Sequence, residues 1–108
     1  MVDFELDEEQ KAACRMAHDF ALNEMRPVAL ECDQTGEIPK ELIKKAAAAG
    51  LTAMAIPDEY GGGGLEQIAA AMVSEELFWG CAGIATTLGA NSLSTTPMVI
   101  AASEELKQ

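Results

Sequence analysis

The chain is 108 residues long, enough for one domain with a modest hydrophobic core. Hydrophobic residues make up 49% of it and aromatic residues only 5%, so the core must be built from aliphatic side chains, and we expect an all-α fold. The net charge of −11, from 18 acidic and 7 basic residues, argues against binding to nucleic acids or anionic membrane surfaces, since both require a basic face.

The cysteines and the amino-terminal residues bear on the cellular compartment. Cys14, Cys32 and Cys81 are odd in number and lack the spacing of a metal site, which favours a reducing compartment. The first residues include the acidic Asp3, Glu5 and Asp7 and lack a basic region followed by an apolar run, so neither a secretory signal nor an arginine-rich transit peptide is expected. The expected location is the cytoplasm, with the mitochondrial matrix as the alternative for a processed organellar form.

The first predicted helix begins after Asp7, because Asp7 and Gln10 have the spacing of a capping box. Pro27 is expected to kink or restart this helix. Residues 33–36 are predicted to form a turn. The apolar positions of the helix are Ala13, Met16, Ala17, Phe20 and Ala21.

A second helix is predicted to have Pro39 at its first position, with its apolar face at Leu42, Ile43 and Ala46. Gly50 is expected to end it as a left-handed C-cap, with Leu51 folding back onto the last turn.

The string IPDEYGGGG, at residues 56–64, contains a run of glycines. Because glycine loses the most conformational entropy on folding, such a run indicates positive φ angles or very close backbone approach. A P-loop would need Lys and Ser/Thr after the last glycine, and a dinucleotide loop would need glycine where Glu66 and Gln67 stand. Asp58 and Glu59 would also repel a phosphate. We therefore expect a structural turn and not an anion site.

The residues after the glycines predict an amphipathic helix with one buried face. Its apolar positions are Leu65, Ile68, Ala69, Met72, Val73 and Leu77. From Leu77 to Ser103 there is no charged residue, so a helix pair buried on both sides is expected, covered by something outside the domain. Glycines and Pro97 interrupt any apolar stretch of about 20 residues, which argues against a membrane span.

Few residues offer chemistry. Cys14 and His18 stand four positions apart and are potential metal ligands, but zinc needs four ligands, so His18 is expected to be an ordinary helix-surface histidine. Glu75 and Glu76 are not an acid–base pair, because adjacent helix positions point about 100° apart; one is expected to face solvent and the other a neighbouring helix.

The aromatic pair Phe78 and Trp79 is expected to pack in the core, with a flavin ring or another subunit as the alternative contact. The chain contains no recognisable nucleophile with an adjacent base, so no catalytic residue and no metal ligand are assigned.

Several strings are informative when taken together and in order: FELDEEQ, EIPKELIKKAAAAGL, IPDEYGGGG, SEELFWGCAG and GANSL. In this order the sequence resembles the amino-terminal helical domain of the acyl-CoA dehydrogenases, over nearly the whole chain. The resemblance implies an up-and-down helical bundle for residues 1–108. Family members are several times longer, so a flavin-binding β domain and a carboxyl-terminal helical domain are expected to be absent here.

The resemblance implies that the complete protein is a flavin-dependent oxidoreductase that uses FAD to desaturate the α,β bond of acyl-CoA thioesters. In this family the base is a glutamate of the carboxyl-terminal domain and the flavin is held mostly by the middle domain, so the fragment alone is expected to be inactive. A homo-oligomer, specifically a tetramer, is also implied. Two alternatives stay open: an acyl-CoA oxidase, and a stand-alone helical interaction module without catalysis.

The family's amino-terminal domain supplies one wall of the acyl-chain cavity. The matching positions, within IATTLGANSL, are Ala85, Thr86, Gly89, Ala90 and Leu93. They are small or apolar, as an acyl pocket requires, although small residues also let helices approach closely. Because Ala85 and Gly89 leave room, medium or long acyl chains are the expected substrates.

The resemblance also implies a shallow docking pocket for electron-transfer flavoprotein. Its matching positions are Ala13, Leu51, Gly63 and Val73. Relatives that dock this partner often carry bulkier apolar residues where Ala13 and Gly63 stand.

Overall fold

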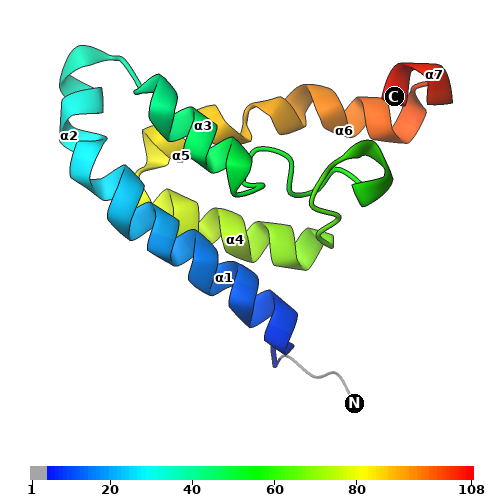
Figure 1. Cartoon of the computed structure of the whole chain (residues 1–108), viewed down its shortest axis with the longest axis horizontal. Helices are drawn as coiled ribbons and strands as arrows, with labels where there is room; N and C mark the ends of the chain where they lie inside the picture. The colour runs from blue at the N-terminus through cyan, green and yellow to red at the C-terminus, as the bar shows by residue number, and fades with distance from the viewer. Residues whose placement is uncertain (1–4) are drawn as a thin grey trace.

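The computed structural model describes residues 5–108, which form helices and no strand, so the all-α prediction is confirmed. Helices α1–α2 and α4 run in one direction and α3 and α5–α6 return in the other, which is the predicted up-and-down arrangement (Figure 1). The elements are α1 (Glu8–Phe20), the π-helical turn η1 (Ala21–Met25), α2 (Arg26–Thr35), α3 (Lys40–Ala48), the 3-10 turn η2 (Asp58–Tyr60), α4 (Gln67–Gly80), α5 (Ala82–Gly89), α6 (Asn91–Ala101) and α7 (Glu104–Lys107).

The start of α1 confirms the predicted capping box. The Gln10 N–H donates to the Asp7 carboxylate at 2.7 Å, and the Asp7 N–H donates to the Gln10 side chain at 3.1 Å. These bonds satisfy backbone donors that a helix start leaves unpaired.

Pro27 restarts the long amino-terminal helix without interrupting its path. Proline has no N–H to offer the carbonyl of Asn23, four residues earlier. Just before it, the Arg26 N–H donates to the carbonyl of Ala21, five residues back, which is the π-helical pattern. Helix α2 then begins at Arg26, with Pro27 in its first turn, as predicted.

The prediction that a turn covers residues 33–36 was wrong about where the turn begins, because α2 continues through Thr35. Only Gly36 leaves the helix, with a left-handed φ of 71° that non-glycine residues rarely adopt. The Thr35 hydroxyl donates to the Glu31 carbonyl at 2.8 Å and so stays within the helical pattern. Pro39 was predicted to be the first residue of the next helix, but it directly precedes that helix. Its ψ of 128° is not helical, and α3 begins at Lys40.

Gly50 ends α3 as predicted. It has a φ of 77°, and its N–H donates to the Ala47 carbonyl. The Leu51 N–H donates to the Ala46 carbonyl at 2.9 Å, which completes a Schellman motif. This geometry turns the Leu51 side chain back into the core, where it is 2% exposed.

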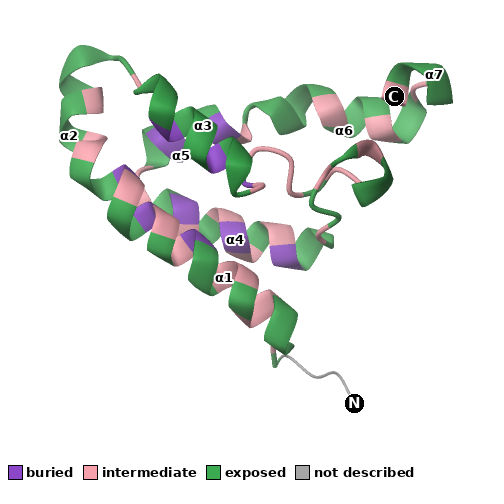
Figure 2. Cartoon of the chain, in the orientation of Figure 1, coloured by how far each residue is buried: buried purple, intermediate pink, exposed green. Residues whose placement is uncertain are grey.

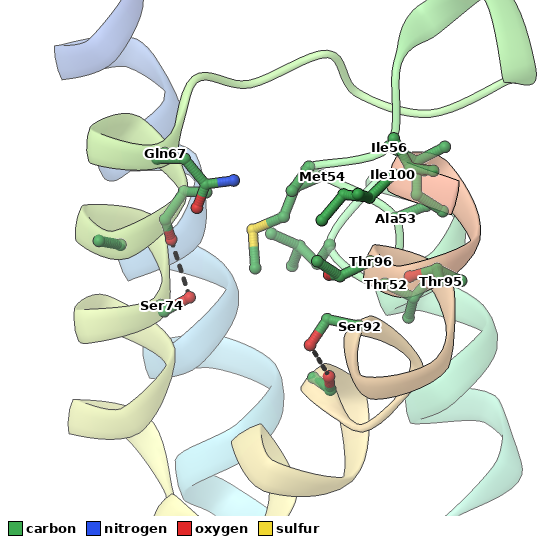
Figure 3. Close-up of a pocket in the computed structure, with 16 residues that line it drawn as sticks. Thr52, Ala53, Met54, Ile56, Gln67, Ser74, Ser92, Thr95, Thr96 and Ile100 are labelled. Carbon is green, nitrogen blue, oxygen red and sulfur yellow. Dashed lines mark hydrogen bonds between the residues drawn. The ribbon is translucent and has the colours of Figure 1, made fainter. Parts of the chain in front are cut away.

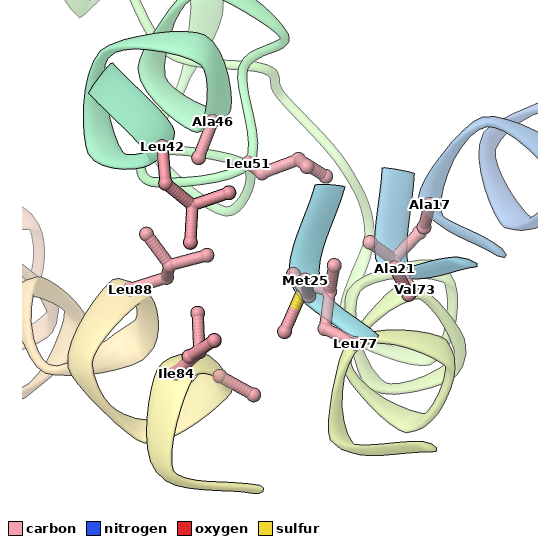
Figure 4. Close-up of a cluster of buried hydrophobic side chains, with 11 residues drawn as sticks. Ala17, Ala21, Met25, Leu42, Ala46, Leu51, Val73, Leu77, Ile84 and Leu88 are labelled. Carbon is pink, nitrogen blue, oxygen red and sulfur yellow. The ribbon is translucent and has the colours of Figure 1, made fainter. Parts of the chain in front are cut away.

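The core lies where η1, α3, α4 and α5 meet (Figure 4). Its fully buried large side chains are Met25, Leu51, Val73 and Ile84. Helix α4 buries Ala69, Val73 and Leu77, three of the six positions predicted for its apolar face, and it begins at Gln67, after the predicted position Leu65. Ile68 was also predicted on this face, but it is 69% exposed. At about 100° per residue, Ile68 lies about 140° around the helix from the centre of the stripe formed by Ala69, Val73 and Leu77, so it faces away from the core.

The uncharged carboxyl-terminal region is covered on one side only (Figure 2). Helix α5 buries Ile84, Ala85 and Leu88, whereas every residue of α6 is at least partly exposed. Leu93 and Ile100 are 81% and 78% exposed. The expected burial on both sides is therefore not achieved within the described chain, because no element of residues 5–108 covers the outer face of α6. In that same range, no helix combines the length and hydropathy that crossing a bilayer requires.

Candidate functional site

A pocket of about 410 Å³ lies between α4, α6 and the segment that follows α3 (Figure 3). Its lining consists of residues 51–56, then Gln67, Ala70, Ala71 and Ser74, and finally Gly89, Ser92, Thr95, Thr96, Val99 and Ile100. Within residues 5–108, this lining includes no charged side chain. The pocket therefore suits an uncharged, largely apolar ligand.

The glycine run holds residues 52–56 in place as one wall of this pocket. Three backbone hydrogen bonds connect the two segments: Gly63 N–H to Ala53 O at 3.0 Å, Gly64 N–H to Ile56 O at 2.9 Å and Leu65 N–H to Met54 O at 2.8 Å. Gly61 and Gly64 have positive φ angles of 83° and 63°. A side chain at position 62 would collide with the backbone of Ile56. The predicted structural turn is confirmed, and its role is to shape the pocket wall.

Three hydroxyl groups in the lining donate their protons to backbone carbonyls three or four residues earlier in the chain. Ser74 donates to the Ala70 carbonyl at 2.8 Å, and Ser92 donates to the Gly89 carbonyl at 2.7 Å. Thr95 likewise donates to the carbonyl of Asn91 at 3.0 Å. Because these donors are already satisfied, the hydroxyl residues can border an apolar ligand without losing a hydrogen bond.

The structure separates the five predicted acyl-wall residues. Ala85 is 2% exposed and belongs to the core, so its side chain lies behind the wall. Gly89 lines the pocket, and an added Cβ there would meet nothing within 4 Å. Thr86, Ala90 and Leu93 are exposed, at spacings that place them on one outer face of α5 and the start of α6.

The four predicted docking residues do not form one accessible surface. Leu51 and Val73 are 2% and 1% exposed and lie in the core, because the Schellman motif and the inner face of α4 direct them inward. Ala13 is half-buried against that core, and Gly63 is exposed in the glycine turn.

His18 makes contacts that the sequence prediction of an ordinary surface histidine missed. Its Nδ1 lies 2.7 Å from Oε2 of Glu76, and its ring stacks on Trp79 with centroids 4.5 Å apart. Glu75 is exposed, so one of the adjacent glutamates faces solvent and the other a neighbouring helix, as predicted. The Arg26 guanidinium lies 4.5 Å from the centre of the Trp79 ring. Trp79 is 46% exposed and packs on the helix surface, so the prediction of core packing was wrong.

Cys14, Cys32 and Cys81 are free thiols. Burial, followed by the carboxylates of Glu76 and Glu75, raises the pKa of the Cys14 thiol. Burial also raises the pKa of Cys32, helped by Cys81. A raised pKa keeps these thiols protonated and poorly nucleophilic. Across the described residues, no group of three or more potential metal ligands occurs.

Sequence reasoning missed residues 52–56 and the hydroxyl residues of α6 as pocket lining. The α6 residues do carry a signal, because Ser92, Thr95 and Thr96 recur at helical spacing within an uncharged region. Residues 52–56 carry none, since their place depends on the backbone bonds to the glycine run.

Comparison with known proteins relates this geometry to a family. Residues 7–108 match the family model of the acyl-CoA dehydrogenase N-terminal domain. The probable acyl-CoA dehydrogenase YngJ of Bacillus subtilis is 38% identical over 108 residues, covering 99% of this chain and 28% of that protein.

Two solved structures share the fold. A chain in the structure of the electron transferring flavoprotein of Acidaminococcus fermentans matches with a TM-score of 0.91 at 37% identity, covering 99% of this chain and 28% of that chain. Butyryl-CoA dehydrogenase from Megasphaera elsdenii matches with a TM-score of 0.85 at 33% identity, covering 98% of this chain and 29% of that chain. The present chain thus spans less than a third of the length of these relatives.

Proposed function

Because the chain belongs to the acyl-CoA dehydrogenase family, of which it forms the amino-terminal domain, we propose that the complete protein desaturates the α,β bond of an acyl-CoA thioester. In this proposal the domain supplies one wall of the acyl-chain pocket. The catalytic base and most of the flavin site lie outside these 108 residues.

The uncharged surface of α5 and α6 is the observation that carries the proposal. Burying an acyl chain against unpaired charges would be costly, and the sequence has no charged residue from Leu77 to Ser103. Gly89 lies where the pocket meets the exposed face formed by Thr86, Ala90 and Leu93. We propose that the acyl chain runs along these residues, with Ala85 supporting them from the core side.

FAD is the proposed cofactor, but neither the pocket beside α6 nor a second pocket at residues 31–40 fits its pyrophosphate. The first pocket has no charged side chain in its lining, and the second, of about 540 Å³, places Lys40 beside Glu31 and Glu37. A pyrophosphate requires a net positive or N–H-rich cradle. The proposal therefore assigns FAD binding to other parts of the complete protein.

We further propose electron-transfer flavoprotein as the electron acceptor and a homotetramer as the assembly. Of the docking residues expected from the family, Ala13 and Gly63 are accessible to the partner protein. Leu51 and Val73 are buried and would pack beneath the docking surface. The proposed location is the cytoplasm or the mitochondrial matrix, which the free cysteines support because thiols persist in reducing compartments.

The substitution Gly89→Glu tests the pocket assignment in the complete protein. A glutamate at this position would extend a charged side chain into the pocket. We expect the wild type to prefer medium or long chains over butyryl, and the variant to shift towards shorter ones. Each methylene excluded costs about 0.8 kcal/mol, or about fourfold in kcat/KM.

Gly83→Glu is the matched control, because it adds the same charge to the same helix outside the pocket, at a position with open space. The measurement is kcat/KM for butyryl to palmitoyl thioesters. A wild-type optimum at butyryl, or an equal shift in both variants, would contradict the assignment. Formation of peroxide with oxygen as acceptor would instead identify an oxidase.

A further inference from the structure

Helix α6 forms one side of the pocket while packing little against the rest of the domain. Its main contacts are with its chain neighbours α5 and α7, and all of its residues are at least partly exposed. The pocket itself separates α6 from α4 and from residues 52–56. The distance between these walls must therefore be set by contacts at the ends of α6.

A three-residue cluster provides such a contact at the far end of α6. The Tyr60 hydroxyl donates to Oε2 of Glu104 at 2.6 Å, and Nζ of Lys107 lies 3.0 Å from Oε1 of the same carboxylate. The Lys107 side chain is only 14% exposed, and its Nζ lies 6.0 Å from the centre of the Tyr60 ring. Figure 1 shows η2, which carries Tyr60, beside α7. The cluster thus joins the loop wall of the pocket to the end of α6.

Both sides of this cluster are held by local backbone bonds. The Tyr60 N–H donates to the Pro57 carbonyl at 3.0 Å, directly after the pocket segment 52–56. On the other side, the Lys107 N–H donates to the Ser103 carbonyl at 3.2 Å, two residues after α6 ends. Because the backbone on each side is ordered, a contact between Tyr60 and Glu104 keeps the two segments at a more constant distance than a contact between mobile side chains would.

We propose that Tyr60 and Glu104 are positioning residues that hold α6 at a fixed distance from residues 52–56 and so determine the width of the pocket. This inference rests on the proposed function only where it concerns acyl-chain selection. For acyl-chain selection, a narrow pocket of fixed width favours extended acyl chains. Loss of the Tyr60–Glu104 contact lets α6 move and weakens the binding of these chains. The hydrogen bond from Tyr60 also lowers the pKa of Glu104, so the carboxylate stays charged and keeps Lys107 paired.

The test compares Tyr60→Phe and Glu104→Gln with the wild type in the complete protein. Glu105→Gln is the control, since it removes the same charge from the same short helix and Glu105 is not part of the cluster of Tyr60, Glu104 and Lys107. Hydrogen–deuterium exchange of residues 91–101 is measured, with residues 8–20 as the internal reference. We expect about two- to fivefold faster exchange in 91–101 for the two variants, as exposed charged pairs typically give, and no change in 8–20 or in the control.

Exchange in 91–101 that is the same in all four proteins, or that rises equally in 8–20, would overturn the positioning role. For selection, we expect the two variants to raise KM for long-chain thioesters with little change in kcat. An unaltered chain-length profile alongside faster exchange would overturn that part. Absence of turnover in the wild type would count against the proposed function alone, because the exchange result does not depend on activity.

Discussion

At the scale of single residues, each glycine in the run 61–64 has its own reason to be there. Gly61 and Gly64 adopt positive φ angles, which side chains disfavour. Gly62 lies against the backbone of Ile56, and a Cβ on Gly63 would stand 3.0 Å from the Met54 carbonyl oxygen. The run therefore serves to bring two backbone segments together, and the pocket wall depends on it.

Tyr60 offers a direct titration, because it is the one tyrosine of the chain. Its hydrogen bond to Glu104 raises the pKa of Tyr60 from 10.0 to about 12. We expect the phenolate absorbance of the 108-residue chain to appear near this pH, and to move towards the ordinary pH in Glu104→Gln but not in Glu105→Gln. An ordinary midpoint in the wild type would contradict the contact.

The same pair has a defined effect on stability. The pKa of Tyr60 is raised, so its hydrogen bond adds to the free energy of unfolding. That contribution is fully present below pH 10.0 and is lost as the pH rises through about 12. The pKa of Glu104 is lowered from its ordinary value of 4.5. The contribution of this carboxylate to the free energy of unfolding is therefore present above pH 4.5 and is lost as the pH falls through the lowered pKa.

At the scale of elements, α4 packs against α1 and η1 through a very close approach at Gly80. A Cβ placed on Gly80 would lie 2.7 Å from the Ala21 Cβ and 3.2 Å from the Ala21 Cα. The helices can approach this closely because one residue is glycine and the other alanine. His18 and Glu76 then add their contact beside this crossing.

We therefore expect Gly80→Ala to destabilise the domain by about 1–3 kcal/mol, the usual cost of overpacking. Gly83→Ala is the control, since it adds the same methyl group to a helix with open space around it. There the higher helix propensity of alanine should stabilise by up to about 1 kcal/mol. Urea unfolding followed by circular dichroism measures both, and equal midpoints for the two variants would show that the crossing is not tight.

At the scale of the whole molecule, the domain leaves apolar side chains uncovered along α6 and α7. Leu93, Ile100 and Leu106 are 81%, 78% and 68% exposed. Single exposed apolar residues are common, but this group lies in a region whose helices carry no charge before Glu104. Such a surface is typical of one that other parts of a protein cover.

The 108-residue chain, expressed alone, should therefore self-associate or bind a hydrophobic dye. Leu93→Ser together with Ile100→Ser should reduce both effects, because these side chains are the most exposed of the group. Sedimentation velocity and dye fluorescence provide the measurements. A monomer at high concentration that binds no dye would argue against a missing partner surface.

The amino-acid sequence by itself determined the local features. The capping box at Asp7, the restart at Pro27 and the C-cap at Gly50 each depend on residues within about five positions, so their chemistry can be read along the chain. The end of α2 was predicted too early, since polar residues 33–35 suit both a turn and a last helical turn, and only the conformation of Gly36 distinguishes them.

Tertiary structure alone decided the pocket and its contacts. His18 and Glu76 are 58 residues apart in sequence, and Tyr60 and Glu104 are 44 apart. Whether such pairs meet depends on how the helices pack, which no local pattern encodes. Val73 shows the same limit: the helical pattern predicted that it is buried and the family resemblance implied a place in a docking pocket, and the packing of α4 leaves it 1% exposed in the core.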